Sequence, residues 1–194
     1  MVMSDTRIRE LIDSGVLRNA LPDNVGPVSY DLVTKAFCTQ EGETARVELA
    51  PGDSVFVACR ELIELPADMT AEVKLRNSRI RQGLSLEAPL YFPGHHTRVF
   101  YRVTNSSADA ITLDTSHGIA QLVFSTVEGP VEHPYDGVFS DELNYRDRAL
   151  PVDIVIVPPQ HHFPQDDNRT ACTEGRPTGQ DGASAYRTTR RDGG

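Results

Sequence analysis

The chain has 194 residues, of which 39% are hydrophobic and 24% charged, and its formal net charge is −9. This length and apolar content predict one folded domain and are too small for two domains of ordinary size. The acidic balance argues against broad nucleic-acid binding, because affinity for a phosphate backbone depends on many lysines and arginines. We therefore expect any anionic partner to meet a local cluster of positive charge.

The sequence also predicts where in the cell the protein is found. No apolar run reaches the ~18 residues that a transmembrane helix requires, and the N-terminal stretch is charged where a signal peptide would be apolar. We expect a cytoplasmic protein with no membrane partner. The three cysteines, Cys38, Cys59 and Cys172, show no C-x-x-C spacing, so reduced structural thiols are expected.

The first element in the chain is a predicted helix. Residues 4–17 carry apolar side chains at helical spacing, with Ser4 or Asp5 positioned as an N-cap and Gly15 near the end. We expect one amphipathic helix there.

After Pro22 the pattern changes to short apolar stretches separated by Pro, Gly, Asn and Asp. We predict strands at 29–33, 45–49, 54–61, 70–75, 97–105, 110–113 and 119–127. Alternation is clearest at 98–103, where Arg98, Phe100 and Arg102 share one face. Many short strands with no intervening helices predict a mainly β fold: a sandwich, jelly roll or barrel.

The C-terminal part has a different composition, with almost no large apolar residues. Such a segment buries too little surface to offset the entropy of ordering it. We expect a folded domain over residues 1–163 and an irregular tail over 164–194. The alternative is that the tail wraps a neighbouring subunit, with Tyr186 as an anchor.

Three stretches in the right order carry a resemblance to a known family. They are residues 4–17 with the motif VSYDL at 28–32, residues 49–84, and residues 93–124 with Pro134-Tyr135 beyond them. Together they resemble dCTP deaminases of the dCTP deaminase/dUTPase superfamily. The resemblance implies a distorted jelly roll or β-barrel of the dUTPase-like type with an N-terminal helix. It also implies a homotrimer with nucleotide sites at the subunit interfaces.

One group of implied substrate-binding residues lies at 76–81. Arg76, Ser78 and Arg81 match the family motif R-S-S-L-A-R, whereas Asn77 and Arg79 depart from it. Guanidinium and hydroxyl donors suit phosphate oxygens, so we interpret this segment as an anion site. The alternative is a salt-bridged surface at the trimer interface.

Two further matches concern the nucleotide. Asp31 corresponds to a family aspartate near the metal and phosphates, although a turn-capping role is an equal alternative. Tyr135 matches a tyrosine that adjoins the nucleotide, but the Lys-Tyr-Gln motif that grips the triphosphate is absent after it. No cofactor is certain from the sequence, and Mg²⁺ is expected only if a nucleotide is bound.

Two family carboxylates are replaced in this chain. Ungapped counting from Pro93-Gly94 to Asn105 places Arg102 where the deaminases have their general-base glutamate, and Phe92 where the dUTPases have an aspartate. A guanidinium cannot act as a base near neutral pH. The resemblance therefore implies that ordinary deamination and the usual dUTPase route are lost.

Three side chains are candidate replacements for the base. Glu87 precedes Ala88, which matches an alanine whose backbone helps to hold the deaminase water. His95 and His96 follow the Pro-Gly turn, and a histidine has a pKa suited to proton transfer. The alternative for both histidines is an exposed turn position at the trimer rim, and two adjacent histidines are weak evidence for a metal.

The strand face of Arg98, Phe100 and Arg102 predicts a pocket wall that is more positive and more aromatic than in the relatives. Such a wall suits a carboxylate or phosphate beside an apolar body. The alternative is that Arg102 pairs internally with Glu87 or Asp114.

Three functions remain open from the sequence. The first is an enzyme whose interface site has been turned to a different small anionic substrate. The second is a dCTP deaminase or dUTP diphosphatase with a relocated general base. The third is a non-catalytic sensor that binds nucleotide.

Overall fold

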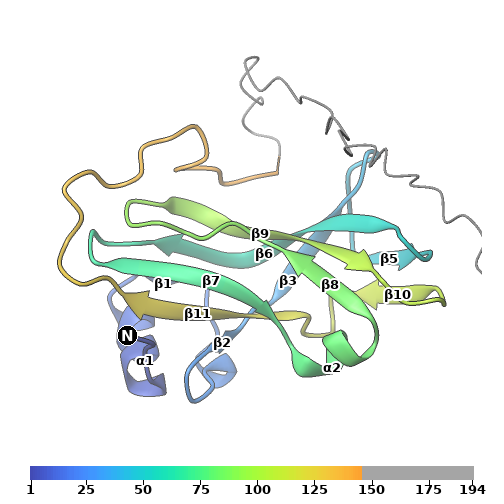
Figure 1. Cartoon of the computed structure of the whole chain (residues 1–194), viewed down its shortest axis with the longest axis horizontal. Coiled ribbons are helices and arrows are strands. Elements are labelled where there is room, and N and C mark those ends of the chain that lie inside the picture. The colour runs from blue at the N-terminus through green and yellow to red at the C-terminus, as the bar shows by residue number, and fades with distance from the viewer. Residues whose placement is uncertain (146–194) are drawn as a thin grey trace, which may run out of the picture. The chain divides into compact units, whose positions relative to one another are not determined.

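The computed structural model describes residues 1–145 (Figure 1). The predicted tail 164–194, Tyr186, Cys172 and the end of the predicted domain 1–163 lie outside the described residues. The elements in chain order are α1 (Asp5–Asp13), β1 (Leu17–Arg18), the 3-10 turn η1 (Pro22–Asn24), β2 (Tyr30–Asp31), β3 (Thr34–Cys38), β4 (Glu43–Thr44), β5 (Arg46–Leu49), β6 (Ser54–Glu64), β7 (Met69–Leu75), α2 (Asn77–Arg81), β8 (Leu84–Glu87), β9 (His96–Asn105), β10 (Ile111–Asp114) and β11 (Ala120–Thr126).

The N-terminal helix is shorter than predicted. Ser4 is the N-cap, but it accepts the first helical bond through its backbone carbonyl, 2.9 Å from the amide nitrogen of Ile8, and its hydroxyl makes no cap bond. The helix ends before Gly15, whose φ of +78° is the left-handed conformation that glycine tolerates best. Leu17 then pairs with Ile63 of β6, so this residue belongs to a sheet and not to the helix.

The strands form three antiparallel sheets. The six-stranded sheet has the order β4-β3-β6-β9-β8, with β1 also paired to β6. The three-stranded sheet has the order β2-β11-β7, and β5 pairs with β10. The predicted mainly β architecture is confirmed.

One core cluster is built from side chains of both larger sheets. The six-stranded sheet contributes the fully buried Val57, Val99 and Tyr101, and the three-stranded sheet contributes Leu122 and Phe124. Successive strand residues point to opposite faces, so the residues between them face away from this core. On β9 this places Arg98, Phe100 and Arg102 together on the outer face, as predicted.

The prediction missed several short elements. The strands β3 and β8 are too short to show clear alternation, and β4 and β1 have two residues each. The expectation that no helix separates the strands was wrong at α2, which follows β7 immediately. This helix has five residues, none of them buried, so it leaves no apolar periodicity in the sequence.

A bulge in β6 buries a carboxyl group. Ala58 pairs with Phe100 and Leu62 pairs with Arg98, so three residues of β6 oppose one residue of β9. Glu61 lies in the bulge and is fully buried. Its carboxylate accepts hydrogen bonds from the Tyr30 hydroxyl at 3.0 Å and from the backbone amide of Val33 at 3.2 Å. Burial raises the pKa of Glu61 above its usual range.

This buried carboxyl makes stability depend on pH. Because the folded state holds the proton more tightly than the unfolded state, wild-type stability should fall as the pH rises above 4.5, the ordinary pKa of the group. The variant Glu61→Gln lacks this titration, so its free energy of unfolding should improve relative to wild type between pH 4.5 and 7.5. Urea denaturation across this range measures the difference, and a constant difference would contradict the assignment. Glu64→Gln, at an exposed position on the same strand, is the control.

Candidate functional site

A pocket of about 250 Å³ lies against the outer face of β9. Its walls come from the end of β8, the loop that joins β8 to β9, the strand β9 itself and the segment 135–142. The residues that line it are Phe56, Glu87, Pro89, Leu90, Tyr91, Phe92, His95, Thr97, Arg98, Phe100, Tyr101, Tyr135, Phe139 and Glu142. The lining is thus largely aromatic, with a few polar groups. A larger hollow of about 360 Å³ beside Cys38 holds none of the predicted site residues.

One part of the pocket lining lies where strand β8 ends. Glu87 and Arg102 form the last pair of the β8–β9 ladder. Beyond it the Tyr91 hydroxyl replaces the strand backbone: it donates to the Phe100 carbonyl and accepts from the Phe100 amide, both at 2.8 Å. Burial raises the pKa of Tyr91, so the hydroxyl stays protonated. The pocket begins where this side chain interrupts the sheet edge.

A tight turn positions the ring of His95. Gly94 has a φ of +96°, and a Cβ at this position would lie 2.8 Å from the carbonyl oxygen of Tyr135, so only glycine fits. The Tyr135 amide donates to the Pro93 carbonyl at 2.7 Å. As a result the Tyr135 ring stacks on His95, with centroids 4.4 Å apart. His95 is 5% exposed, and burial lowers the pKa of its imidazole.

Arg98 holds one wall of the pocket in place. Its guanidinium donates to the carbonyls of Cys59 and Arg60 in the β6 bulge, at 2.8 and 3.0 Å, and to the Leu143 carbonyl at 2.8 Å. The Arg98 amide also donates to the Glu142 carbonyl at 2.9 Å. Arg98 was expected to bind substrate. In the structure its guanidinium donates to backbone carbonyls instead.

Arg102 and Glu87 form an ion pair on the outer face of the sheet. The guanidinium carbon of Arg102 also lies 5.8 Å from the centre of the Phe56 ring. Glu87 is among the residues that line the pocket, whereas Arg102 is not. Of the two partners considered for Arg102, the structure selects Glu87, because Asp114 bonds to Ser116 and His117.

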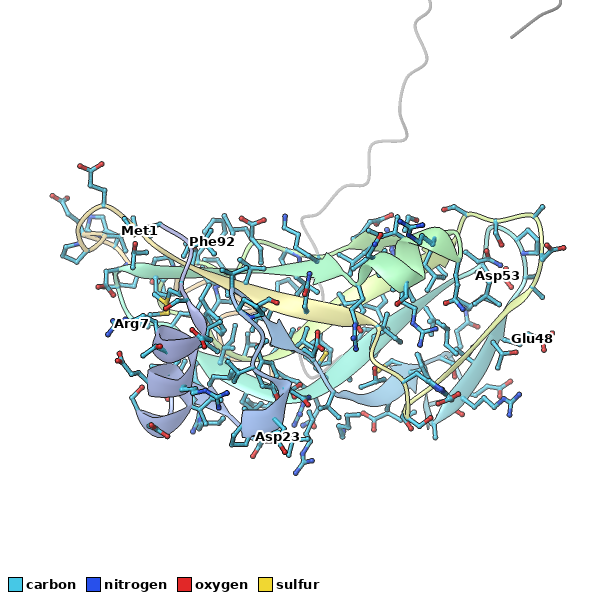
Figure 2. The ribbon with its side chains drawn as sticks, turned by 90° about the horizontal axis from the view of Figure 1, so that it is seen from below. Met1, Arg7, Asp23, Glu48, Asp53 and Phe92 are labelled. Carbon is cyan, nitrogen blue, oxygen red and sulfur yellow. The ribbon has the colours of Figure 1, made fainter. Side chains whose placement is uncertain are left out.

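The other predicted groups lie elsewhere. His96 is exposed and bonds through Nε2 to Arg18, outside the pocket. Ala88 lies beside Val73 and Leu75 and does not line the pocket. Figure 2 shows Phe92 at the end of the molecule that also carries Met1, with Glu48 and Asp53 at the opposite end. Phe92 is 46% exposed, so it forms part of the pocket rim.

The basic segment forms a separate group. Arg76, Ser78 and Arg81 belong to α2 and its N-cap, at the end of β7, whereas the segment after β11 lies at the other end of the sheets in Figure 1. The Nη1 atom of Arg76 lies 3.4 Å from Oδ2 of Asp31, so the two side chains form an ion pair. Both line a hollow of about 260 Å³. No residue of α2 is among those that line the pocket on β9.

The acidic and metal-ligating side chains of the described residues are dispersed. Residues 1–145 contain no group of three or more His, Cys, Asp or Glu side chains that could hold a metal ion. Asp31 is the one carboxylate that lines the hollow beside Arg76, and it faces that guanidinium. A Mg²⁺ ion bound here would need most of its oxygen ligands from the phosphates of a nucleotide.

Sequence reasoning missed several pocket residues. Tyr91, Thr97 and Glu142 stand in no recognisable motif. Thr97 donates to the Glu142 carbonyl at 2.6 Å, a contact across 45 residues. The alternation of β9, the Pro-Gly turn and the matches at Glu87–Ala88 and Tyr135 marked this region in the sequence.

The comparisons with known proteins agree with this architecture. Residues 35–127 match the dCTP deaminase-like family. The dCTP deaminase of Natronomonas pharaonis is 32% identical over 166 residues, covering 70% of this chain and 85% of the relative. The chain belongs to the dCTP deaminase-like family. The dCTP deaminase of Thermococcus kodakarensis is 27% identical over 143 residues, covering 71% of this chain and 90% of the relative.

A solved structure supports the fold. The 2'-deoxycytidine 5'-triphosphate deaminase of Agrobacterium tumefaciens superimposes with a TM-score of 0.55 at 18% identity, covering 63% of this chain and 46% of that one. This likeness confirms the predicted fold class. Among residues 1–145, no helix is long and apolar enough to cross a membrane.

The contacts of Arg98 lead to a test of the pocket wall. Arg98→Ala removes three donors to backbone carbonyls, so we expect a loss of about 1–3 kcal/mol in stability. The amides of His96 and Arg98, which donate to Ser140 and Glu142, should exchange faster in hydrogen–deuterium exchange. Arg60→Ala, at an exposed position on β6, should leave this exchange unchanged. Equal protection in Arg98→Ala and wild type would show that the guanidinium does not hold the wall.

Proposed function

We propose that the chain is a hydrolytic enzyme of its family, acting on a pyrimidine nucleotide, with its general base on β8 and not on β9. The observation that carries this is Glu87. Its carboxylate lines the pocket, and Arg102, at the position of the missing base, binds it from across the strand pair. This arrangement supports a general base on β8, the strand next to the one that carries the base in the deaminases.

Arg102 acts in this proposal as a positioning residue. A guanidinium that bonds to a carboxylate restricts its rotamers and so holds its oxygens in place. The ionised Glu87 accepts a proton from a water molecule, and the resulting hydroxide adds to the ring carbon that carries the amino group. Glu87 then returns the proton to the amino group, and the carbon–nitrogen bond breaks with release of ammonia. The names of two relatives, dCTP deaminase and dUMP-forming dCTP deaminase, support the pyrimidine nucleotide as substrate class.

A homotrimer is the second part of the proposal. Within one chain, Arg76, Ser78 and Arg81 are not among the residues that line the pocket on β9. A site at the interface between copies would combine the aromatic pocket of one with the basic segment of another, as the family resemblance implies. The basic segment would then bind phosphate through charge-assisted hydrogen bonds.

Glu87→Gln tests the relocated base. Gln keeps the size of the side chain but cannot accept the proton, so release of ammonia or pyrophosphate from dCTP and dUTP should fall at least ~100-fold. Glu72→Gln, on the exposed edge of β7, should retain wild-type turnover. Light scattering first checks that each variant keeps the mass of wild type, three times 21.4 kDa for the proposed trimer. Turnover that survives Glu87→Gln would refute the base assignment.

A second candidate keeps the pocket but changes the substrate. By the family resemblance, Phe92 stands where the dUTPases have an aspartate. The lining is mostly aromatic, which favours a small anion with an apolar body. In that case Arg102 would bind the anion directly, after displacing Glu87. Turnover of neither dCTP nor dUTP, with a thermal shift on adding nucleotide, would instead support a non-catalytic sensor.

The same variant separates the two candidates. If Arg102 binds an anionic ligand, Glu87→Gln frees the guanidinium, and affinity for inorganic phosphate or benzoate should rise several-fold. If Glu87 is the base, phosphate affinity stays within about twofold while turnover is lost. Thermal-shift titrations at low salt measure this, because ionic contacts near the surface weaken with ionic strength. Arg102→Ala is the matched control and should remove any gain.

A further inference from the structure

The hydrogen bonds of His95 determine which ring nitrogen carries its proton. The Nδ1 atom lies 2.9 Å from the amide nitrogen of Phe92 and 3.0 Å from the carbonyl oxygen of the same residue. That carbonyl already accepts a bond from the His95 amide at 3.2 Å. If Nδ1 carried the proton, the Phe92 amide would have no acceptor among the described residues. Both backbone groups are satisfied only when Nδ1 accepts, which leaves the proton on Nε2.

The ring is also held rigidly. It stacks on Tyr135, with an angle of 16° between the planes, and meets the Tyr91 ring edge to face at 5.5 Å. The glycine at 94 and the bond from Tyr135 to Pro93 fix the turn that carries it. Since Nδ1 faces its own turn, the opposite edge with Nε2 is left for the pocket that His95 lines. Among residues 1–145, Nε2 has no hydrogen-bond partner.

We infer that His95 is a fixed, neutral hydrogen-bond donor that recognises an acceptor oxygen of the ligand through Nε2–H. This deepens the proposed function and rests on it, since the acceptor we assign is a carbonyl oxygen of a pyrimidine ring. In this state neither ring nitrogen offers a free lone pair. His95 is therefore a specificity residue and not the substitute base considered from the sequence.

The aromatic surroundings strengthen this role. A hydrogen bond made away from water discriminates strongly against a ligand that cannot accept it, because the donor is then left unpaired. His95 is almost fully buried between Tyr91, Phe92 and Tyr135. His96, one residue later, provides a contrast: it is exposed and its Nε2 accepts from Arg18.

The test combines side-chain ¹⁵N NMR with binding of dUMP, which supplies ring carbonyls without turnover. At pH 7 the His95 spectrum should show an unprotonated Nδ1 and a protonated Nε2. His95→Phe keeps the stacking but removes the donor, so its affinity for dUMP should fall at least ~10-fold. His95→Gln, whose amide can both accept from Phe92 and donate to the ligand, should recover part of the loss. His96→Phe should bind as wild type does.

Each outcome has a separate meaning. A proton on Nδ1, a doubly protonated ring at pH 7, or unchanged dUMP binding by His95→Phe would overturn the inference while the proposed function stands. Wild-type protein that binds neither dUMP nor dCTP would refute the proposed function, and with it the assigned ligand. Should His95→Phe fail to fold, the NMR result and the His95→Gln affinity decide the matter.

Discussion

The guanidinium of Arg98 joins β9, which forms one wall of the pocket, to the bulge in β6 and to the segment that follows β11. It bonds to two carbonyls in the β6 bulge and to one carbonyl in the segment that follows β11. A bulge turns backbone carbonyls away from the regular ladder, so they need donors from elsewhere. Arg98 supplies these donors from the neighbouring strand. The pocket wall and the bulge are therefore parts of one hydrogen-bonded unit.

The bulge has a second consequence on the core side of the sheet. It carries Glu61 into the interior, where the Tyr30 hydroxyl and the Val33 amide satisfy the carboxylate. A buried carboxyl without such partners would be strongly unfavourable. The irregularity in β6 thus arranges an ionisable group on each face of the sheet. Both depend on partners from distant segments.

The ion pair between Arg102 and Glu87 places a carboxylate next to the position where the family resemblance implies a missing base. Counting along β9 from the Pro93-Gly94 turn predicts that Arg102 stands where the deaminases have their base, and this stays a prediction. The cross-strand neighbour, however, brings a carboxylate to the same outer face. Catalytic groups are defined by where their atoms lie, so a neighbouring strand can supply what one strand has lost. The absence of a catalytic residue from one sequence position is therefore weaker evidence for lost activity than the absence of any carboxylate from the pocket would be.

Similarity and site chemistry answer different questions in this protein. The matched family region and the relatives establish fold and family. They do not decide what the pocket binds, because one fold can carry sites of different chemistry. The tautomer of His95 follows from two backbone groups of Phe92 alone. Its chemistry is thus a local property of this turn.

The sequence by itself determined the features that depend on neighbouring residues. Apolar spacing indicated the helix at the N-terminus, and alternation placed Arg98, Phe100 and Arg102 on one face of β9. The Pro93-Gly94 dipeptide marked the turn. Only the tertiary structure decided that Arg98 bonds to β6, that Arg102 meets Glu87 and not Asp114, and that His95 is buried while His96 is exposed. These outcomes depend on strand register and on contacts between segments up to 45 residues apart, which local patterns do not encode.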